Sequence, residues 1–357
     1  MRQVLPVRTE DARIVNLKVG DGNGTTDVSQ VIAAVNWIVQ NRNSNGMNIK
    51  VLELAYSTDS TQDYTVSPLT YALEVAWQKG ITVVVAAGND GKASGLAMPA
   101  IDPWLLSVGA ADTKGTVVSS DDSVANFSST GKSSWTGRGP DVVAPGVSLP
   151  SLRVPGGKAD TGSPSARIGD RFFKGSGTSQ ASAVVAGAVA LIAQERPSAT
   201  PDQIKAVITQ HAQWLNGETN GTMGQGEINL AWVIGMNDGW AEQSRARGAG
   251  TGSIDAARGT HRPTLNGVAL QGDKDIFGKT VNSTNLAQAA SSGTAWNGGS
   301  WNGSSWTGSS WTGSSWTGSS WTGSSWTGST WTGSTWTGSS WTGSSWTGSA
   351  WSSNGWG

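Results

Sequence analysis

Apolar runs and amphipathic stretches alternate along residues 1–236, and this alternation predicts the fold class. Short apolar segments with the length of β-strands cover residues 14–19, 51–55, 82–87, 105–110 and 141–144. Longer segments with the spacing, length or capping residues of helices cover residues 27–40, 67–79, 181–196 and a stretch that begins at Thr200. Because strands and helices alternate, we expect an α/β fold with a doubly wound, mostly parallel sheet flanked by helices.

Tryptophan shows where the chain changes character. Thirteen of the 20 Trp residues occupy every fifth position from Trp296 to Trp356, mostly in the unit Trp-Thr-Gly-Ser-Ser. The segment before this repeat contains several Gly and Arg residues and few apolar clusters. This composition favours an extended or loosely packed linker. We therefore expect a globular region over residues 1–236, a connector over residues 237–295 and a pentapeptide repeat over residues 296–357.

The repeat allows two interpretations. Its five-residue period matches neither the 3.6 residues of a helical turn nor the two residues of a strand, and no residue after Lys279 is charged. A flexible, low-complexity tail is one interpretation. The other is a binding tail, in which regularly spaced Trp rings stack on the sugars of a cell-surface polysaccharide and many weak contacts add up.

Charge and composition exclude several classes of function. The formal net charge is −1, so the strongly basic surface of a nucleic-acid-binding protein is not expected. There is no Cys, which excludes disulfides, thiolate metal sites and a Cys nucleophile. The longest apolar run, residues 183–193, is too short for a membrane span, and residues 1–8 contain no apolar segment of a signal peptide.

Two segments have the residues of a catalytic site. Gly177-Thr178-Ser179 precedes a predicted helix, where backbone amides and the helix dipole favour a developing negative charge beside a nucleophilic Ser179. Gly88-Asn89 follows a predicted strand, and the amide of Asn89 can donate to an oxyanion. Taken alone, Ser179 is equally consistent with an ordinary helix N-cap and Asn89-Asp90-Gly91 with a turn.

Together these segments resemble the subtilisin-like serine proteases, the subtilase family. Gly177-Thr178-Ser179-Gln180-Ala181 resembles the family's nucleophile motif, and Ala86-Ala87-Gly88-Asn89 resembles its oxyanion motif. Residues 141–146, Asp-Val-Val-Ala-Pro-Gly, resemble another recurrent segment, and residues 11–19 resemble the strand after the catalytic-His helix. The Trp-Gly-Ser repeat resembles tails on some actinobacterial secreted subtilases.

The resemblance implies a serine endopeptidase that hydrolyses peptide bonds in polypeptide substrates. Ser179 would form the acyl-enzyme and Asn89 would contribute to the oxyanion hole. The expected substrate-binding residues are Ala55, Tyr56, Ser57, Ala87 and Gly88. A secreted or cell-surface location follows from the family alone. The sequence specifies no cofactor or metal site, although structural Ca²⁺ is common among subtilases.

The catalytic Asp and His are missing from this sequence. In subtilases both precede the serine, but His211 and His261 follow Ser179, and no Asp-Thr/Ser-Gly or His-Gly-Thr-His motif occurs. We therefore expect an N-terminally incomplete catalytic domain that is inactive as this isolated chain. The alternative is a decayed, non-catalytic subtilase whose tail binds glycan, and the inward Glu53 beside Ala55-Tyr56-Ser57 favours it.

Overall fold

The computed structural model describes residues 12–17, 19–20, 26–131, 138–233, 241–265, 268–297, 300–305, 310–317, 320–322, 325–337, 340–342 and 345–352. They fall into two compact units. The first comprises residues 1–12, 48–59 and 73–248, and the second comprises residues 13–47, 60–72 and 249–357. Helix α2 (Pro68–Gln78) begins in the second unit and ends in the first. The boundary expected at residues 236–237 lies outside the described residues.

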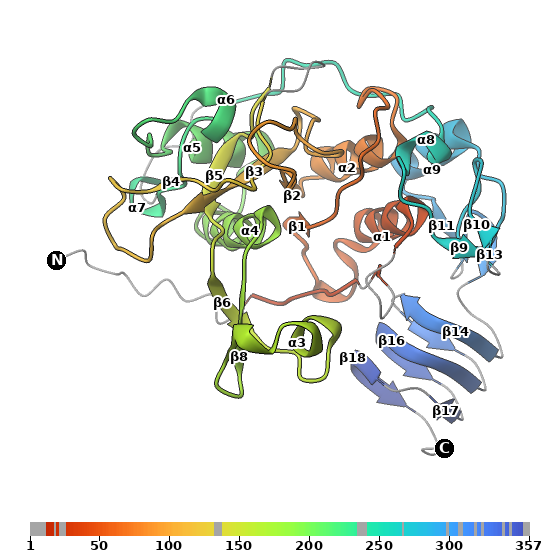
Figure 1. Ribbon diagram of the computed structural model, residues 1–357. Coiled ribbons are helices and arrows are strands. Elements are labelled where there is room, and N and C mark those ends of the chain that lie inside the picture. The colour runs from red at the N-terminus through yellow and green to blue at the C-terminus, as the bar shows by residue number, and fades with distance from the viewer. Residues whose placement is uncertain are drawn as a thin grey trace. The chain divides into compact units, whose positions relative to one another are not determined.

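A five-stranded sheet forms the centre of the first unit (Figure 1). Four strands are parallel in the order β1–β2–β3–β5, and β4 pairs antiparallel with β3. The strands are β1 (Val51–Leu54), β2 (Thr82–Ala86), β3 (Leu106–Asp112), β4 (Ser123–Val124) and β5 (Val142–Pro145). Every residue of β2 is buried, so both faces of the sheet are covered there.

Helices complete the core of this unit. Helix α4 (Thr178–Glu195) packs against all four parallel strands, and α5 (Pro201–Gln210) packs against β2. The inner face of α4 buries Val185, Val189 and Ile192, whose spacing of four and three residues keeps them on one side of the helix. The predicted α/β fold, with a mostly parallel sheet flanked by helices, is confirmed.

Smaller elements surround this core. A second sheet of the first unit, in the order β6–β8–β7, is antiparallel. In the short helix α3, the carboxylate of Asp160 accepts hydrogen bonds from Arg153 and Arg167, which lower the pKa of Asp160. The elements are β6 (Leu149–Leu152), β7 (Arg167–Ile168), β8 (Phe172–Gly175), α3 (Lys158–Gly162), α6 (Asn220–Met223), α7 (Leu230–Val233) and a 3₁₀ turn, Pro164–Ala166.

Two fully buried carboxyl groups lie in the first unit. Burial and, to a smaller extent, the nearby Glu74 together raise the pKa of Asp102 to about 8. Burial also raises the pKa of Glu74 to about 7, although the amide of Gly248 donates to it at 2.8 Å. Among the described residues, one oxygen of each carboxyl group has no hydrogen-bond partner. Both groups are therefore protonated in the folded state at mildly acidic pH.

We expect the chain to lose stability as pH rises from about 4 to about 8. Unfolding lets Asp102 and Glu74 ionise near pH 4, whereas the folded state holds their protons until about pH 7–8. Urea unfolding at acidic and alkaline pH should show a fall of roughly 2–4 kcal/mol, which Asp102→Asn reduces. Asp121→Asn, at an exposed site, is the control. Equal falls in the wild type and Asp102→Asn would contradict this explanation.

The second unit is built around helix α1 (Val28–Asn41). Asp27 caps this helix and forms a capping box with Gln30. A 3₁₀ turn, Ser44–Gly46, follows α1. The other elements before the long repeat are α8 (Ile254–Ala257), β9 (Thr264–Leu265), β10 (Val268–Ala269), α9 (Ser283–Ser292), β11 (Trp296–Asn297), β12 (Ser300–Trp301) and β13 (Ser304–Ser305).

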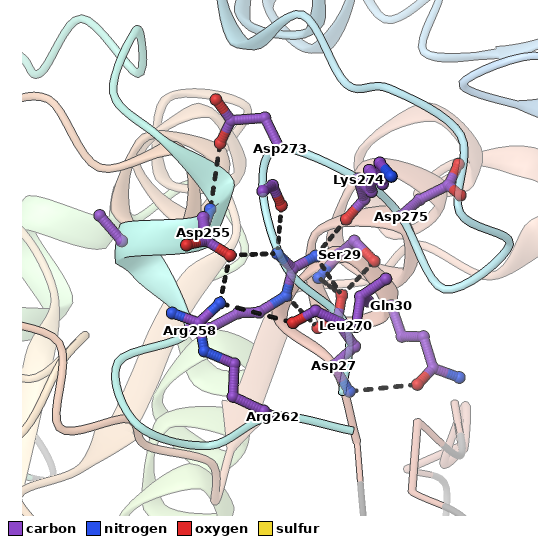
Figure 2. Close-up of polar contacts among 12 residues, drawn as sticks. Asp27, Ser29, Gln30, Asp255, Arg258, Arg262, Leu270, Asp273, Lys274 and Asp275 are labelled. Atoms are coloured by element: carbon purple, nitrogen blue, oxygen red, sulfur yellow. Dashed lines mark hydrogen bonds and ion pairs between the residues drawn. The ribbon is translucent and has the colours of Figure 1, made fainter. Parts of the chain in front are cut away.

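A buried ion pair joins α1 to the segment after residue 249 (Figure 2). Arg258 Nε lies 2.6 Å from Asp27 Oδ2, and both side chains are 0% exposed. The same guanidinium donates to the carbonyls of Gly272, at 2.7 Å, and Lys274. This part of the predicted connector is therefore packed in the described structure, in contrast to the loose linker that its composition indicates.

The first two repeat units belong to the same packed structure. Trp301 is 2% exposed. The indole Nε1 of Trp296 donates to the carbonyl of Ala33 in α1 at 2.8 Å, and Gln40 hydrogen-bonds to the Trp296 backbone. Strands β11, β12 and β13 form an antiparallel sheet around these two Trp residues. The start of the repeat is thus anchored to α1.

The rest of the described repeat forms parallel strands (Figure 1). They are β14 (Ser310–Thr317), β15 (Ser320–Thr322), β16 (Ser325–Thr337), β17 (Ser340–Thr342) and β18 (Ser345–Ser352). Strand β16 pairs with the other four, always with residues 15 positions away, as Trp311 pairs with Trp326. Three pentapeptides therefore make one repeat of the backbone pattern. Flexibility of this segment in solution stays a prediction.

One predicted element is wrong. Of residues 14–19, all but Lys18 are described, and none of these belongs to a strand. The side chain of Ile14 is 91% exposed and that of Val15 is 40% exposed. An apolar alternation becomes a strand only when a neighbour pairs with it, and no described segment does so here.

In the described part of the chain no helix is long and apolar enough to cross a membrane.

Candidate functional site

Ser179 lies in the first turn of α4. The helix starts at Thr178, earlier than the predicted residue 181, and its N-cap is Gly177. Ser179 is therefore the second helical residue and not an N-cap, which removes that alternative. The side chain is half-buried, and the preceding turn is held by a 2.8 Å hydrogen bond from Gly177 N to the carbonyl of Gly146. This position places the hydroxyl-bearing residue in the first turn of a helix, where the backbone amides have no partner within the helix.

Asn89 is held against the same helix turn. Its Oδ1 accepts hydrogen bonds from Thr178 N, at 2.9 Å, and from Thr178 Oγ1, at 3.0 Å. Thr178 Oγ1 in turn accepts from Gly88 N at 3.2 Å. Because the amide oxygen is occupied, the NH₂ group is the end of Asn89 that can donate to a developing oxyanion. The two predicted site residues, Ser179 and Asn89, are thus brought together through Thr178.

Two glycines make this close approach possible. Gly88 has a φ of +111°, and an added Cβ would lie 2.8 Å from Ser129 Oγ. An added Cβ at Gly146 would lie 2.6 Å from the Cβ of Ala110. A larger residue at Gly88 would displace Ser129, and one at Gly146 would crowd Ala110 and the carbonyl of Gly177, 3.0 Å away, which precedes Thr178.

The predicted substrate-binding residues fall into two groups. Ala55, Tyr56 and Ser57 follow β1, which pairs only with β2 among the described strands, and Ala55 and Ser57 are exposed. The backbones of Ala87 and Gly88 are engaged internally. Ala87 N donates to the carbonyl of Val108, and the carbonyl of Ala87 accepts from Ala97 N. The carbonyl of Gly88 accepts from Ser129 N. The exposed members of the predicted substrate-binding set therefore lie within residues 55–57.

Glu53 reaches the nucleophile-bearing helix from β1. The hydroxyl of Ser182 lies 2.7 Å from Glu53 Oε1 and 2.9 Å from the backbone oxygen of Ser179, and it can donate to either. Glu53 is exposed, so the inward position expected from the sequence is wrong. Partial desolvation of its carboxyl group still raises the pKa of Glu53, and the hydrogen bond from Ser182 partly opposes this rise. The Ser182 hydroxyl thus lies within hydrogen-bond distance of both the Glu53 carboxyl group and the backbone oxygen of Ser179.

A charge network anchors the segment 141–146. Asp141 accepts hydrogen bonds from Arg138 Nη2 at 2.7 Å and Ser107 N at 2.8 Å, and Lys205 Nζ lies 3.2 Å away. Burial opposes the ionisation of Asp141, but Lys205 and Arg138 outweigh it and hold the pKa below its usual value. The network fixes the start of β5 and therefore the position of Gly146, which supports the turn before Ser179.

The two histidines have other surroundings. His211 is the C-cap of α5, and its Nδ1 lies 3.0 Å from the carbonyl of Val207. His261 belongs to the second unit. Among the described residues, no group of three or more His, Cys, Asp or Glu side chains is arranged to hold a metal ion. The described site therefore consists of a serine, an amide donor and a carboxyl group, without a histidine hydrogen-bonded to the serine.

Sequence reasoning missed the roles of Thr178 and Ser182. Thr178 carries both contacts that orient Asn89, and Ser182 links the Ser179 backbone to Glu53. Both residues flank the nucleophile within one helical turn. A hydroxyl next to the proposed nucleophile was the available signal, but the partners lie far away in the sequence.

Comparisons with known proteins agree on one group of relatives. The model of the subtilase family matches residues 7–250. The serine protease AprX of Bacillus subtilis is 35% identical over 223 residues, which cover 61% of this chain and 50% of that protein. Subtilisin E of Bacillus subtilis is 32% identical over 222 residues, which cover 61% and 48%. The chain thus spans about half the length of these relatives.

A solved structure is also similar. Fervidolysin from Fervidobacterium pennivorans, described as a keratinolytic enzyme related to subtilisin, has 26% sequence identity and a TM-score of 0.48. The match covers 61% of this chain and 30% of that one.

Proposed function

Because the chain belongs to the subtilase family, we propose that its first unit carries the nucleophile and oxyanion donor of a serine endopeptidase. Ser179 attacks the scissile carbonyl of a polypeptide and forms the acyl-enzyme. The NH₂ group of Asn89 stabilises the tetrahedral oxyanion. The observation that carries the proposal is the pair of hydrogen bonds from Thr178 to Asn89 Oδ1, which ties Asn89 to the residue before Ser179 and leaves the NH₂ group as the donating end of its amide.

The substrate lies along residues 55–57 in this proposal, of which Ala55 and Ser57 are exposed. They extend β1 beyond its last paired residue, so an extended peptide can pair with their backbone. Ala87 and Gly88 contribute the wall beside Asn89, since their backbone groups are already engaged. The base and its orienting carboxylate come from a segment with Asp-Thr/Ser-Gly and His-Gly-Thr-His motifs, which this sequence lacks. A secreted or cell-surface location is part of the same proposal.

Asn89 offers the sharpest test of the oxyanion role. The chain is fused to the N-terminal segment of a subtilase that carries both missing motifs, and peptide hydrolysis is measured. Asn89→Asp keeps an oxygen for Thr178 but removes the NH₂ group, so we expect kcat to fall by about 10²–10³, the loss found when subtilisin loses this donor. Asp90→Asn, at the exposed neighbour, should leave kcat unchanged. Full activity in Asn89→Asp would contradict the proposed role and leave Asn89 as a structural clamp.

A second function is favoured by the backbone of the repeat. Pairing at an offset of 15 residues brings Trp onto Trp, as at Trp326 and Trp341, so the repeat contains regular columns of aromatic residues. Such columns suit multivalent stacking on a polysaccharide. In this alternative the chain is a non-catalytic subtilase that binds cell-surface glycan.

Glycan binding is checked by co-sedimentation with insoluble polysaccharides. We expect the chain to sediment with at least one polysaccharide and a version ending at Ser305 to lose that binding, since it keeps the anchored repeats and lacks β14–β18. Equal binding by both versions would exclude the repeat as the glycan site.

A further inference from the structure

The strands β14–β18 form three successive layers, here called coils, whose paired residues are 15 positions apart in the sequence. Coil one contains β14 and β15, coil two is β16, and coil three contains β17 and β18. Paired residues of these strands meet their counterparts in the next coil, as Ser310 does with Ser325 and Ser325 with Ser340. Because the sequence period is five residues, the 15-residue offset pairs Trp with Trp and Gly with Gly, and the other pairs join Ser, Thr and, once, Ala. The backbone pattern is that of a short parallel solenoid.

The third coil has an open edge. Coil two pairs on both sides, but among the described residues β17 and β18 pair with β16 alone. One side of each strand therefore presents amide and carbonyl groups without a ladder partner, which is a template for another strand. Natural edges are usually protected by charged residues or Pro. Here no charged residue follows Lys279 and no Pro follows Pro263.

The best-matched strand for this edge is another copy of the same repeat. Within the chain, Trp-containing pentapeptides pair with pentapeptides of nearly the same sequence 15 residues away, so a second chain offers strands that match the same register. A net charge of −1 gives two copies little long-range repulsion. We propose that the edge formed by β17 and β18 docks the repeat of a second copy, which makes the repeat a self-association module.

Sedimentation velocity on the whole chain tests this proposal. Across a roughly hundredfold range of concentration, the sedimentation coefficient should rise as dimers or larger species form. The variant Thr342→Lys/Thr347→Lys places a charge on each edge strand and should weaken association by at least about tenfold. Val117→Lys/Asn216→Lys adds the same charge at two exposed sites of the first unit and should associate like the wild type.

Hydrogen exchange separates β-pairing from simple adhesion of Trp side chains. If the edge docks a second copy, amides in residues 340–352 exchange more slowly at high concentration, while those of β16 are unchanged because β16 is already paired on both sides. The proposal is overturned if the chain stays monomeric over the whole range, or if the edge variant associates like the wild type. It is also overturned if association occurs without slower exchange in residues 340–352.

Discussion

Without an added segment, the chain is expected to hydrolyse peptides about 10⁶-fold more slowly than a complete subtilase. Ser179 is a weak nucleophile unless a base removes its proton, and no histidine is hydrogen-bonded to it in the described site. In subtilisin, loss of the catalytic histidine alone lowers kcat by about 2 × 10⁶. What remains comes from the oxyanion site and substrate binding, and Asn89 supplies the first of these in our proposal.

The measurement is the rate of reaction with a fluorophosphonate probe and with a peptide substrate. The wild-type chain and Ser179→Ala should be nearly indistinguishable, because the reactivity of Ser179 is close to that of any serine. Glu53→Gln provides a control for a substitute base, since Glu53 is the carboxyl group linked through Ser182 to the Ser179 backbone. Fast, stoichiometric labelling of Ser179 in the isolated chain would show that a base is present after all.

Replacing Arg258 by Met is expected to lower the free energy of unfolding of the second unit by about 3–5 kcal/mol. Both side chains of the pair are 0% exposed. The substitution therefore leaves the Asp27 carboxylate buried without its charged partner. It also removes the donor to the carbonyls of Gly272 and Lys274, which tie the segment after residue 249 to α1 (Figure 2).

A double variant distinguishes loss of the ion pair from loss of packing. Asp27→Asn removes the stranded charge and keeps a side-chain oxygen as N-cap, so Asp27→Asn/Arg258→Met should recover part of the loss. Lys114→Met breaks a largely exposed pair with Asp112 and should change stability by less than about 1 kcal/mol. Hydrogen exchange of α1 amides reports on the second unit directly. A loss below about 1 kcal/mol in Arg258→Met would contradict a stabilising role for the buried pair.

Local residue patterns in the sequence predict much of the fold. The apolar run of residues 82–87 predicts a strand covered on both faces, and β2 is that strand with every residue buried. Residues 27–40 are correctly predicted as a helix because apolar spacing and the capping residues Asp27 and Gln30 act within a few positions. The strand predicted over residues 14–19 is wrong, because a strand also needs a pairing partner and the sequence pattern does not identify one.

Contacts between distant positions could not be predicted. Arg258 lies in a segment rich in Gly and Arg, which composition describes as a linker, yet its buried partner Asp27 is 231 positions away. Thr178 and Asn89 are separated by 89 positions, so the orientation of the Asn89 amide follows only from the folded chain. The repeat shows its five-residue period in the sequence, but the 15-residue register depends on how the backbone turns.

The central claim is that Ser179 is the nucleophile of this subtilase domain. The direct measurement is mass-spectrometric mapping of the fluorophosphonate adduct on the chain fused to a segment with the missing Asp and His motifs. Trypsin cleaves after Lys174 and Lys205 but not at the Arg196–Pro197 bond, so it should release residues 175–205, with the adduct on Ser179 and none in Ser179→Ala. An adduct on Ser176 or Ser182, or peptide hydrolysis that persists in Ser179→Ala, would contradict the claim.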